Sequence, residues 1–308
     1  MRKPSVLVSL ITCENDFQLG QAVAAEQAAA RLGIGISITF AENDAVNQSQ
    51  QLLNVIHNKT ERPDAILVES VGTGMNQVAK AAVEAGIGWG IVNREVDYLP
   101  ELRRIARAPV FALTGDHREV GEIQAKQFEA LLKGDDGGIL YIEGPSAGTT
   151  ARLRSGGMNA AKKLAIPVTT IRGDWTEQSG YHAVMSWLAL STSRRTNIRV
   201  VGCQNDAMAM GARKAFEESE NAREPNKWLA FPFTGVDGLP GTGQKWVKQG
   251  ILAATVITPP HMGIAMQLLH DALRSGSQPP EWTVNSSESF PEVEALAGKG
   301  QLARGHHA

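Results

Sequence analysis

The chain has few cysteines, few aromatic residues and almost no net charge. Its 308 residues include two cysteines, Cys13 and Cys203, too few for a disulfide framework. We expect both to be small buried apolar residues that stay reduced. The net charge of −2 excludes the basic surface that nucleic acid or an anionic membrane would attract. We therefore expect no nucleic-acid partner.

Long apolar runs are also missing. No segment approaches the roughly 18 consecutive apolar residues of a membrane span, so we expect no direct membrane insertion. The first residues, MRKPSVLVSLITC, have the basic residues, apolar run and cysteine of a lipoprotein leader. The run 6–11 is short for a leader, and Thr12 is a poor residue before a lipidated cysteine. We interpret the run as a core strand, and expect a periplasmic protein if a leader has been removed and otherwise a cytoplasmic one.

Motifs that carry catalysis or bind cofactors are absent. There is no G-x-S-x-G nucleophile motif. His261 and His270 lack the i, i+4 spacing of a helical pair of metal ligands. In the segment 238–245, Gln244 stands where the Lys of a phosphate-binding loop must follow the final glycine, and no Ser or Thr follows it. The segment 72–74 lacks the third glycine of a dinucleotide fingerprint. We expect no catalytic residue, no metal and no cofactor, and hence not an enzyme.

Apolar strand-like runs alternate with helix-like patterns along most of the chain. The predicted strands are 6–11, 34–40, 65–68, 88–92, 110–113, 139–142, 168–171, 199–201, 229–233, 252–257 and 282–284. The predicted helices are 17–32, 46–58, 75–85, 119–132, 151–164, 178–190, 206–219, 244–249 and 262–274. This alternation predicts an α/β protein with parallel sheets built from βαβ units. More than about ten strands are too many for one twisted sheet, so we expect two Rossmann-like lobes.

The lobe boundaries follow from where the pattern restarts or breaks. Gly115 and Asp116 form a turn and helix-start signal, and Pro259 with Pro260 breaks a strand. We expect an N-terminal lobe of 1–115 plus about 260–289 and a C-terminal lobe of 116–259 plus about 290–308, joined by a multi-strand hinge. Strand 282–284 should be the last, at a sheet edge, and 292–308 should be frayed.

Polar residues recur directly after the predicted strands. They are found at 14–17, 93–94, 174–175, 205–206, 237 and 258. Ligands of open α/β sheets bind beyond the carboxyl ends of the strands. We expect the polar residues of both lobes to converge on one cleft, which is a binding arrangement rather than a catalytic one.

Three short stretches are the most specific in the chain. They are QNDAMA at 204–209, GTTARLR at 148–154 and GVDG at 235–238, supported by LAATV at 252–256. With these stretches the chain, from Val6 to Val284, resembles periplasmic sugar-binding proteins of the ribose-binding type. Their type I periplasmic binding protein fold is shared with lactose-repressor-type effector domains. The resemblance implies a solute-binding protein that captures a small carbohydrate or polyol in an inter-lobe cleft by hinge closure, for ABC-type uptake or for sensing.

The resemblance also implies a set of ligand-binding residues. In it, the two aromatic residues stack on a sugar ring, while the polar and charged residues bind its hydroxyls. The set is Asn15, Phe17, Gln18, Asn93, Arg94, Arg154, Trp175, Asn205, Asp237 and Thr258. We expect Asp206 to cap its helix without touching the ligand.

Departures from the family pattern argue against ribose as the ligand. Gln18 stands in place of an aromatic residue, Asn93 in place of an aspartate and Thr258 in place of a glutamine. Asn93 removes one acceptor charge next to Arg94. We expect a sugar, polyol or sugar acid other than ribose, with any anionic group paired to Arg94 or Arg154. We expect a monomer whose partner is an ABC permease or a sensor protein.

One alternative stays open. It is an effector or sensor protein related to lactose-repressor-type regulators but without their DNA-binding domain. Those regulators carry a helix-turn-helix of some fifty residues before the first strand, and here the first strand begins at Val6.

Overall fold

The structure is a computed structural model that describes residues 3–133, 136–163, 166–219 and 228–299. Its residues cluster into two compact units. The first unit contains Met1–Gly115, Ala147–Thr149 and Pro260–Asn285, and the second contains Asp116–Ser146, Thr150–Pro259 and Ser286–Ala308. Each unit has one six-stranded sheet. Among the described residues, the strand pairs are parallel except for one antiparallel pair in the second sheet. The prediction of two α/β lobes with parallel sheets is therefore confirmed.

The first unit is built on a sheet with the strand order β11-β5-β4-β3-β1-β2. Its strands are β1 (Ser5–Leu10), β2 (Gly35–Phe40), β3 (Ala65–Val68), β4 (Gly88–Val92), β5 (Val110–Gly115) and β11 (Trp282–Asn285). Its helices are α1 (Asp16–Leu32), α2 (Ala45–His57), α3 (Asn76–Glu84), α4 (Leu99–Ile105) and α11 (Met262–Ser275).

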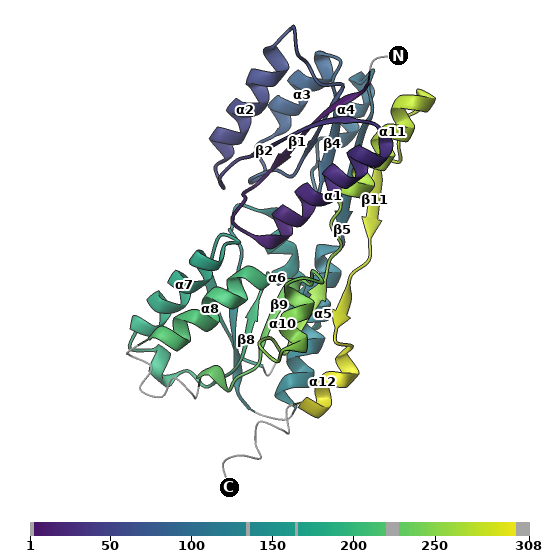
Figure 1. The fold of residues 1–308 in the computed structure, drawn as a ribbon. Coiled ribbons are helices and arrows are strands. Elements are labelled where there is room, and N and C mark those ends of the chain that lie inside the picture. Colours follow the sequence, from purple (N-terminus) through teal and green to yellow (C-terminus); the bar gives the residue numbers. More distant parts are fainter. Residues whose placement is uncertain (1–2, 134–135, 164–165, 220–227, 300–308) are drawn as a thin grey trace. The chain divides into compact units, whose positions relative to one another are not determined.

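Both faces of this sheet are covered, which explains why its strands read as continuous apolar runs. Along β1, Leu7 packs with α2, α3 and α4, whereas Val6 and Val8 pack with α1 and α11 on the other face. Helices α1 and α11 lie side by side (Figure 1). The helices of the unit thus cover the two faces of the sheet. The loops after the strands therefore gather at the carboxyl ends of the parallel strands.

The second unit is built on a sheet with the order β12-β10-β9-β8-β6-β7. Its strands are β6 (Gly138–Glu143), β7 (Val168–Arg172), β8 (Ile198–Cys203), β9 (Phe233–Asp237), β10 (Ala254–Ile257) and β12 (Glu288–Phe290), of which β12 runs antiparallel to β10. Its α-helices are α5 (His117–Leu132), α6 (Thr149–Ala161), α7 (Glu177–Ala189), α8 (Asp206–Glu218), α10 (Gly243–Lys248) and α12 (Val293–Lys299), and a short 3-10 helix spans Ser193–Arg195.

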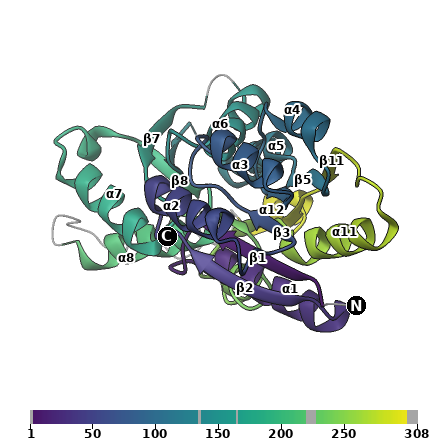
Figure 2. The same ribbon diagram turned by 90° about the horizontal axis from the view of Figure 1, so that it is seen from above.

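The second sheet is also packed on both faces. Leu140 and Ile142 of β6 pack with α7 and α8, which lie side by side (Figure 1 and Figure 2). Ile139 and Tyr141 face the other way, toward α5, α6 and α12. Within the part of the chain that the structure describes, no helix is long and apolar enough to cross a membrane.

Helix α4 was not predicted. It is seven residues long, its N-cap residue Tyr98 makes no side-chain capping bond, and Pro100 lies in its first turn. Leu99 and Leu102 bury it on the sheet, so tertiary packing stabilises a helix that has weak local signals.

The strand predicted at 229–233 is misplaced. Leu229 is helical, and β9 begins at Phe233, directly after Pro232, and ends at Asp237. The apolar residues before Pro232 instead join an aromatic cluster, in which Trp228 stacks on Phe216 with ring centroids 5.1 Å apart.

The end of the chain also differs from the prediction. Strand 282–284 does lie at the edge of the first sheet, but it is not the last strand, because β12 follows and joins the second sheet. The expected boundary near residue 289 therefore falls inside β12. Residues 293–299, expected to be frayed, form α12, whose Leu296 is fully buried against α5.

Candidate ligand-binding site

In the first unit, three predicted site residues follow β1 at the start of α1. Asn15 has extended backbone angles and caps α1, with its Oδ1 accepting a hydrogen bond from the Gln18 amide at 2.9 Å. The Gln18 Oε1 accepts from the Ile11 amide at 3.0 Å. Phe17 is 6% exposed. Asn15 and Gln18 thus hold the loop after β1 in a fixed shape.

Asn93 and Arg94 follow β4 and are both buried. Asn93 has a φ of 57°, in the left-handed region that asparagine tolerates well. Arg94 donates from Nε to the Ser70 carbonyl at 2.9 Å and from Nη1 to the Asn93 carbonyl at 2.7 Å. Burial lowers the pKa of Arg94, and the charge of Glu69 acts against that shift.

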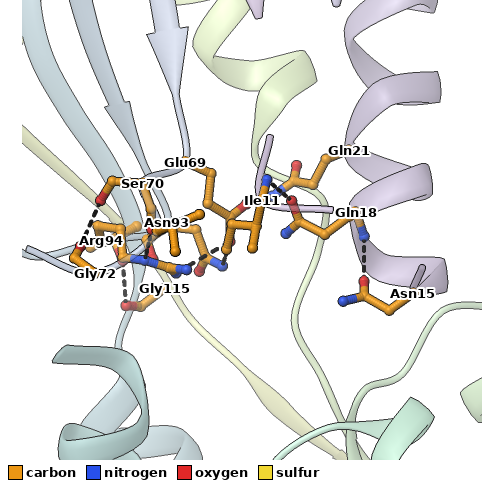
Figure 3. A network of polar contacts seen from close by, with 12 residues as sticks. Ile11, Asn15, Gln18, Gln21, Glu69, Ser70, Gly72, Asn93, Arg94 and Gly115 are labelled. Atoms are coloured by element: carbon orange, nitrogen blue, oxygen red, sulfur yellow. Dashed lines mark hydrogen bonds and ion pairs between the residues drawn. The ribbon is translucent and has the colours of Figure 1, made fainter. Parts of the chain in front are cut away.

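Glu69 is a candidate site residue that the sequence analysis missed. It follows β3, is 1% exposed, and accepts hydrogen bonds from Asn93 Nδ2 at 2.8 Å and Arg94 Nη1 at 3.2 Å (Figure 3). The expected loss of an acceptor charge beside Arg94 is therefore wrong, because a different strand supplies that charge. The sequence does contain the signal, since Glu69 comes directly after the apolar run 65–68.

Two fully buried glutamines hold Glu69 in place. Gln21 donates to the Glu69 Oε2 at 3.4 Å, and Gln48 donates to the Glu69 carbonyl at 3.0 Å. Gln21 also accepts from the Met262 amide at 2.9 Å, which connects α1 to α11. Glu69 is thus the centre of a hydrogen-bonded network that joins residues of α1 and α2 to those after β4 (Figure 3).

In the second unit, Asn205 connects two predicted site segments. It caps α8, with its Oδ1 accepting from the Met208 amide at 2.9 Å, and its Nδ2 donates to the Trp175 carbonyl at 2.8 Å. Trp175 has a φ of 77°, a conformation that is rare for a bulky residue. The amide of Asn205 therefore holds the backbone that presents the indole.

The indole of Trp175 is placed by its neighbours. A Cβ atom at Gly144 would lie closer than 3.0 Å to the far edge of the indole, so only glycine leaves room for this close approach. The Arg154 guanidinium carbon lies 5.8 Å from the centre of the indole ring. Gln204 fixes both neighbours, because its carbonyl accepts from Arg154 and its Oε1 accepts from the Gly144 amide at 2.9 Å.

Asp206 does not cap α8, and this part of the prediction is wrong, because Asn205 is the cap. Asp206 is 3% exposed and accepts from the Gly238 amide at 2.9 Å and from the Thr255 hydroxyl at 2.7 Å. It therefore connects α8 to the segment after β9 and to β10.

Asp237 is the last residue of β9, and Thr258 directly follows the neighbouring strand β10. Asp237 has a φ of 109° and is 7% exposed. The Thr258 amide donates to the Asp237 carbonyl at 3.1 Å. The Thr258 hydroxyl is buried and has no hydrogen-bond partner among the described residues. A buried hydroxyl without a partner destabilises the fold, so it calls for an explanation.

The two cysteines differ from the expectation in one respect. Both are free, and Cys203 is buried, where desolvation raises the pKa of its thiol well above the ordinary value. Cys13 is exposed, so its predicted burial is wrong. Among the described residues, no group of three or more His, Cys, Asp and Glu side chains could hold a metal ion.

The predicted site residues thus gather into two clusters, one at the carboxyl ends of the strands in each unit. The first-unit cluster consists of the residues that follow its strands, which are Asn15, Phe17 and Gln18 after β1 and Asn93 and Arg94 after β4, and the structure adds Glu69 after β3. The second-unit cluster contains Arg154, Trp175, Asn205, Asp237 and Thr258.

The sequence match agrees with this architecture. The family of the periplasmic binding protein domain matches residues 6–277, and the chain belongs to this family.

Several binding proteins are similar over most of their length. The D-allose-binding periplasmic protein of Escherichia coli is 28% identical over 295 residues, covering 94% of this chain and 90% of the relative. The ribose import binding protein RbsB of Haemophilus influenzae is 26% identical, covering 84% and 81%. A crystal structure of a galactofuranose binding protein matches with a TM-score of 0.80 at 20% identity, covering 97% of this chain and 99% of that one. That likeness shows the same fold.

Proposed function

We propose that this protein binds a small sugar or polyol and delivers it to an ABC-type uptake system. The observation that carries the proposal is the gathering of buried polar side chains at the carboxyl ends of the strands in both units. Relatives that bind allose and ribose support this class of ligand.

The chemistry of the two clusters suits hydroxyl groups. Asn93 and Asn205 carry both donors and an acceptor, Asp237 accepts, and the arginines donate. The unpartnered Thr258 hydroxyl would gain a hydrogen-bond partner from a ligand hydroxyl. We propose that the two clusters contribute to one ligand site, with Phe17 and Trp175 packing on the apolar faces of a sugar ring.

The proposal is tested by measuring thermal stability and heats of binding with a defined panel. The panel is D-allose, D-ribose, D-galactose, L-arabinose, myo-inositol and glycerol. We expect at least one compound to bind with a micromolar or lower Kd and to change the fluorescence of Trp175. The variant Trp175→Phe separates this residue from the other tryptophans. No binding by any panel member at millimolar concentration would contradict the proposal.

We further propose that the ligand draws the two units together, and that the protein works in the periplasm without a chemical step of its own. A saturating ligand should lower the radius of gyration in small-angle X-ray scattering. NMR of the recovered ligand should show it unchanged, and osmotic shock should release the protein from cells that express it natively. The relatives reported above are binding proteins. They therefore do not favour the alternative of an effector or sensor protein related to lactose-repressor-type regulators.

A further inference from the structure

The cluster in the first unit contains a charge pair that the family resemblance did not lead us to expect. Glu69 Oε1 and Arg94 Nη1 lie 3.2 Å apart, and their side chains are 2% and 7% exposed. The positive charge of Arg94 is therefore balanced inside the protein. Asn93 Nδ2 donates to the same Glu69 oxygen at 2.8 Å, while Gln21 donates to the other at 3.4 Å (Figure 3).

The Glu69–Arg94 pair interacts differently with a ligand hydroxyl and with a ligand carboxylate. A ligand hydroxyl can donate to a carboxylate and accept from a guanidinium, so it matches both partners. A ligand carboxylate only accepts, and it would place a second negative charge beside Glu69. At a separation of about 5 Å and an effective dielectric constant near 20, this repulsion corresponds to roughly a 250-fold change in Kd, and it offsets the attraction of the carboxylate to Arg94. The effect persists at physiological salt because the pair is buried.

We propose that Glu69 is a specificity-determining residue that makes the first-unit cluster select uncharged hydroxyl-bearing ligands over sugar acids. The inference rests on the proposed function and narrows its ligand class. It replaces the expectation of an anionic ligand group at Arg94, which depended on Asn93 standing in place of an aspartate.

The test is titration calorimetry on three proteins, the wild type, Glu69→Gln and Glu95→Gln. The neutral probes are the sugars and polyols of the panel above, and the acidic probes are D-galacturonate, D-glucuronate and D-ribonate. For each protein, the ratio of the tightest acidic Kd to the tightest neutral Kd measures selectivity. Glu95 is the matched control, because it is an exposed carboxylate next to Arg94 in sequence and water screens its charge.

We expect the wild type to bind a neutral probe at least about tenfold more tightly than any acid. Glu69→Gln should reduce this ratio at least about fivefold, and Glu95→Gln should leave it unchanged. An acid that binds the wild type as tightly as any neutral probe overturns the inference, even if Glu69→Gln fails to fold. A folded Glu69→Gln protein that gains no affinity for acids also overturns it.

The two proposals fail in different ways. If the wild type binds an acid best, the proposed sugar-binding function stands and the role of Glu69 is wrong. If the wild type binds no probe of either kind, the proposed function is wrong and the inference falls with it.

Discussion

Replacing Asp206 by alanine should destabilise the second unit without removing a ligand contact. The change deletes the acceptors of two buried hydrogen bonds, from the Gly238 amide and the Thr255 hydroxyl. Hydrogen bonds to a charged group each contribute about 1.5–3 kcal/mol, offset in part by the cost of burying the charge. We expect a loss of about 3 kcal/mol in the free energy of unfolding, or a Tm lower by about 6–12 °C.

Asp16 provides a matched control within the same chain. It is also the first residue of a helix whose N-cap is asparagine, but it is exposed. Asp16→Ala removes only a favourable interaction with the helix dipole, of about 0.5 kcal/mol. Both variants are measured by thermal and urea denaturation followed by circular dichroism. If Asp206→Ala unfolds within 1 kcal/mol of Asp16→Ala, the assigned role of Asp206 is refuted.

Three further outcomes follow from the structure. Gly144→Ala should displace the half-buried indole of Trp175. We expect the ligand affinity to fall by about tenfold and the free energy of unfolding by less than about 2 kcal/mol. Unchanged affinity in calorimetry would contradict this prediction. Thr258→Val should leave the free energy of unfolding unchanged or raise it by about 1 kcal/mol, because it removes an unpartnered buried hydroxyl. The same variant should bind the ligand more weakly. A clear fall in Tm would show that the hydroxyl has a partner. A thiol reagent should label Cys13 quickly and Cys203 only after denaturation. If mass spectrometry detects label on both thiols of the native protein, the assigned burial of Cys203 is wrong.

The architecture was largely predictable because most of its elements have clear local patterns. Strand β4 agrees with its predicted residues 88–92, since it is buried on both faces and bounded by glycine and a polar pair. Strand β9 was misplaced because its own residues include Thr234 and Gly235, which give a weak apolar signal. Gly235 is required there by the neighbouring Asp206, whose side chain occupies the place of a Cβ atom. Only the packed structure reveals that requirement.

The candidate site could be predicted only through residues that match the family pattern. Asn205 and Trp175 were identified separately, and the structure connects them through a hydrogen bond of 2.8 Å. Gln204 lies in the same polar triplet but holds Gly144 and Arg154 through contacts that sequence spacing cannot show. Glu69 was missed because its partner Arg94 follows a different strand and is 25 residues away in the sequence.

The site residues differ in how strongly they argue for a ligand. Asn15 and Asn205 both cap helices, so helix stability alone accounts for asparagine at these positions. A buried ion pair is different, because replacing it by apolar residues of similar size is often neutral or stabilising. The charges of Glu69 and Arg94 therefore contribute little to the stability of the fold, and their burial beyond the strand ends is consistent with the proposed role in ligand recognition. For this reason the joint replacement of Glu69 and Arg94 by apolar residues of similar size, rather than substitution of the more numerous asparagines, should separate ligand recognition from folding.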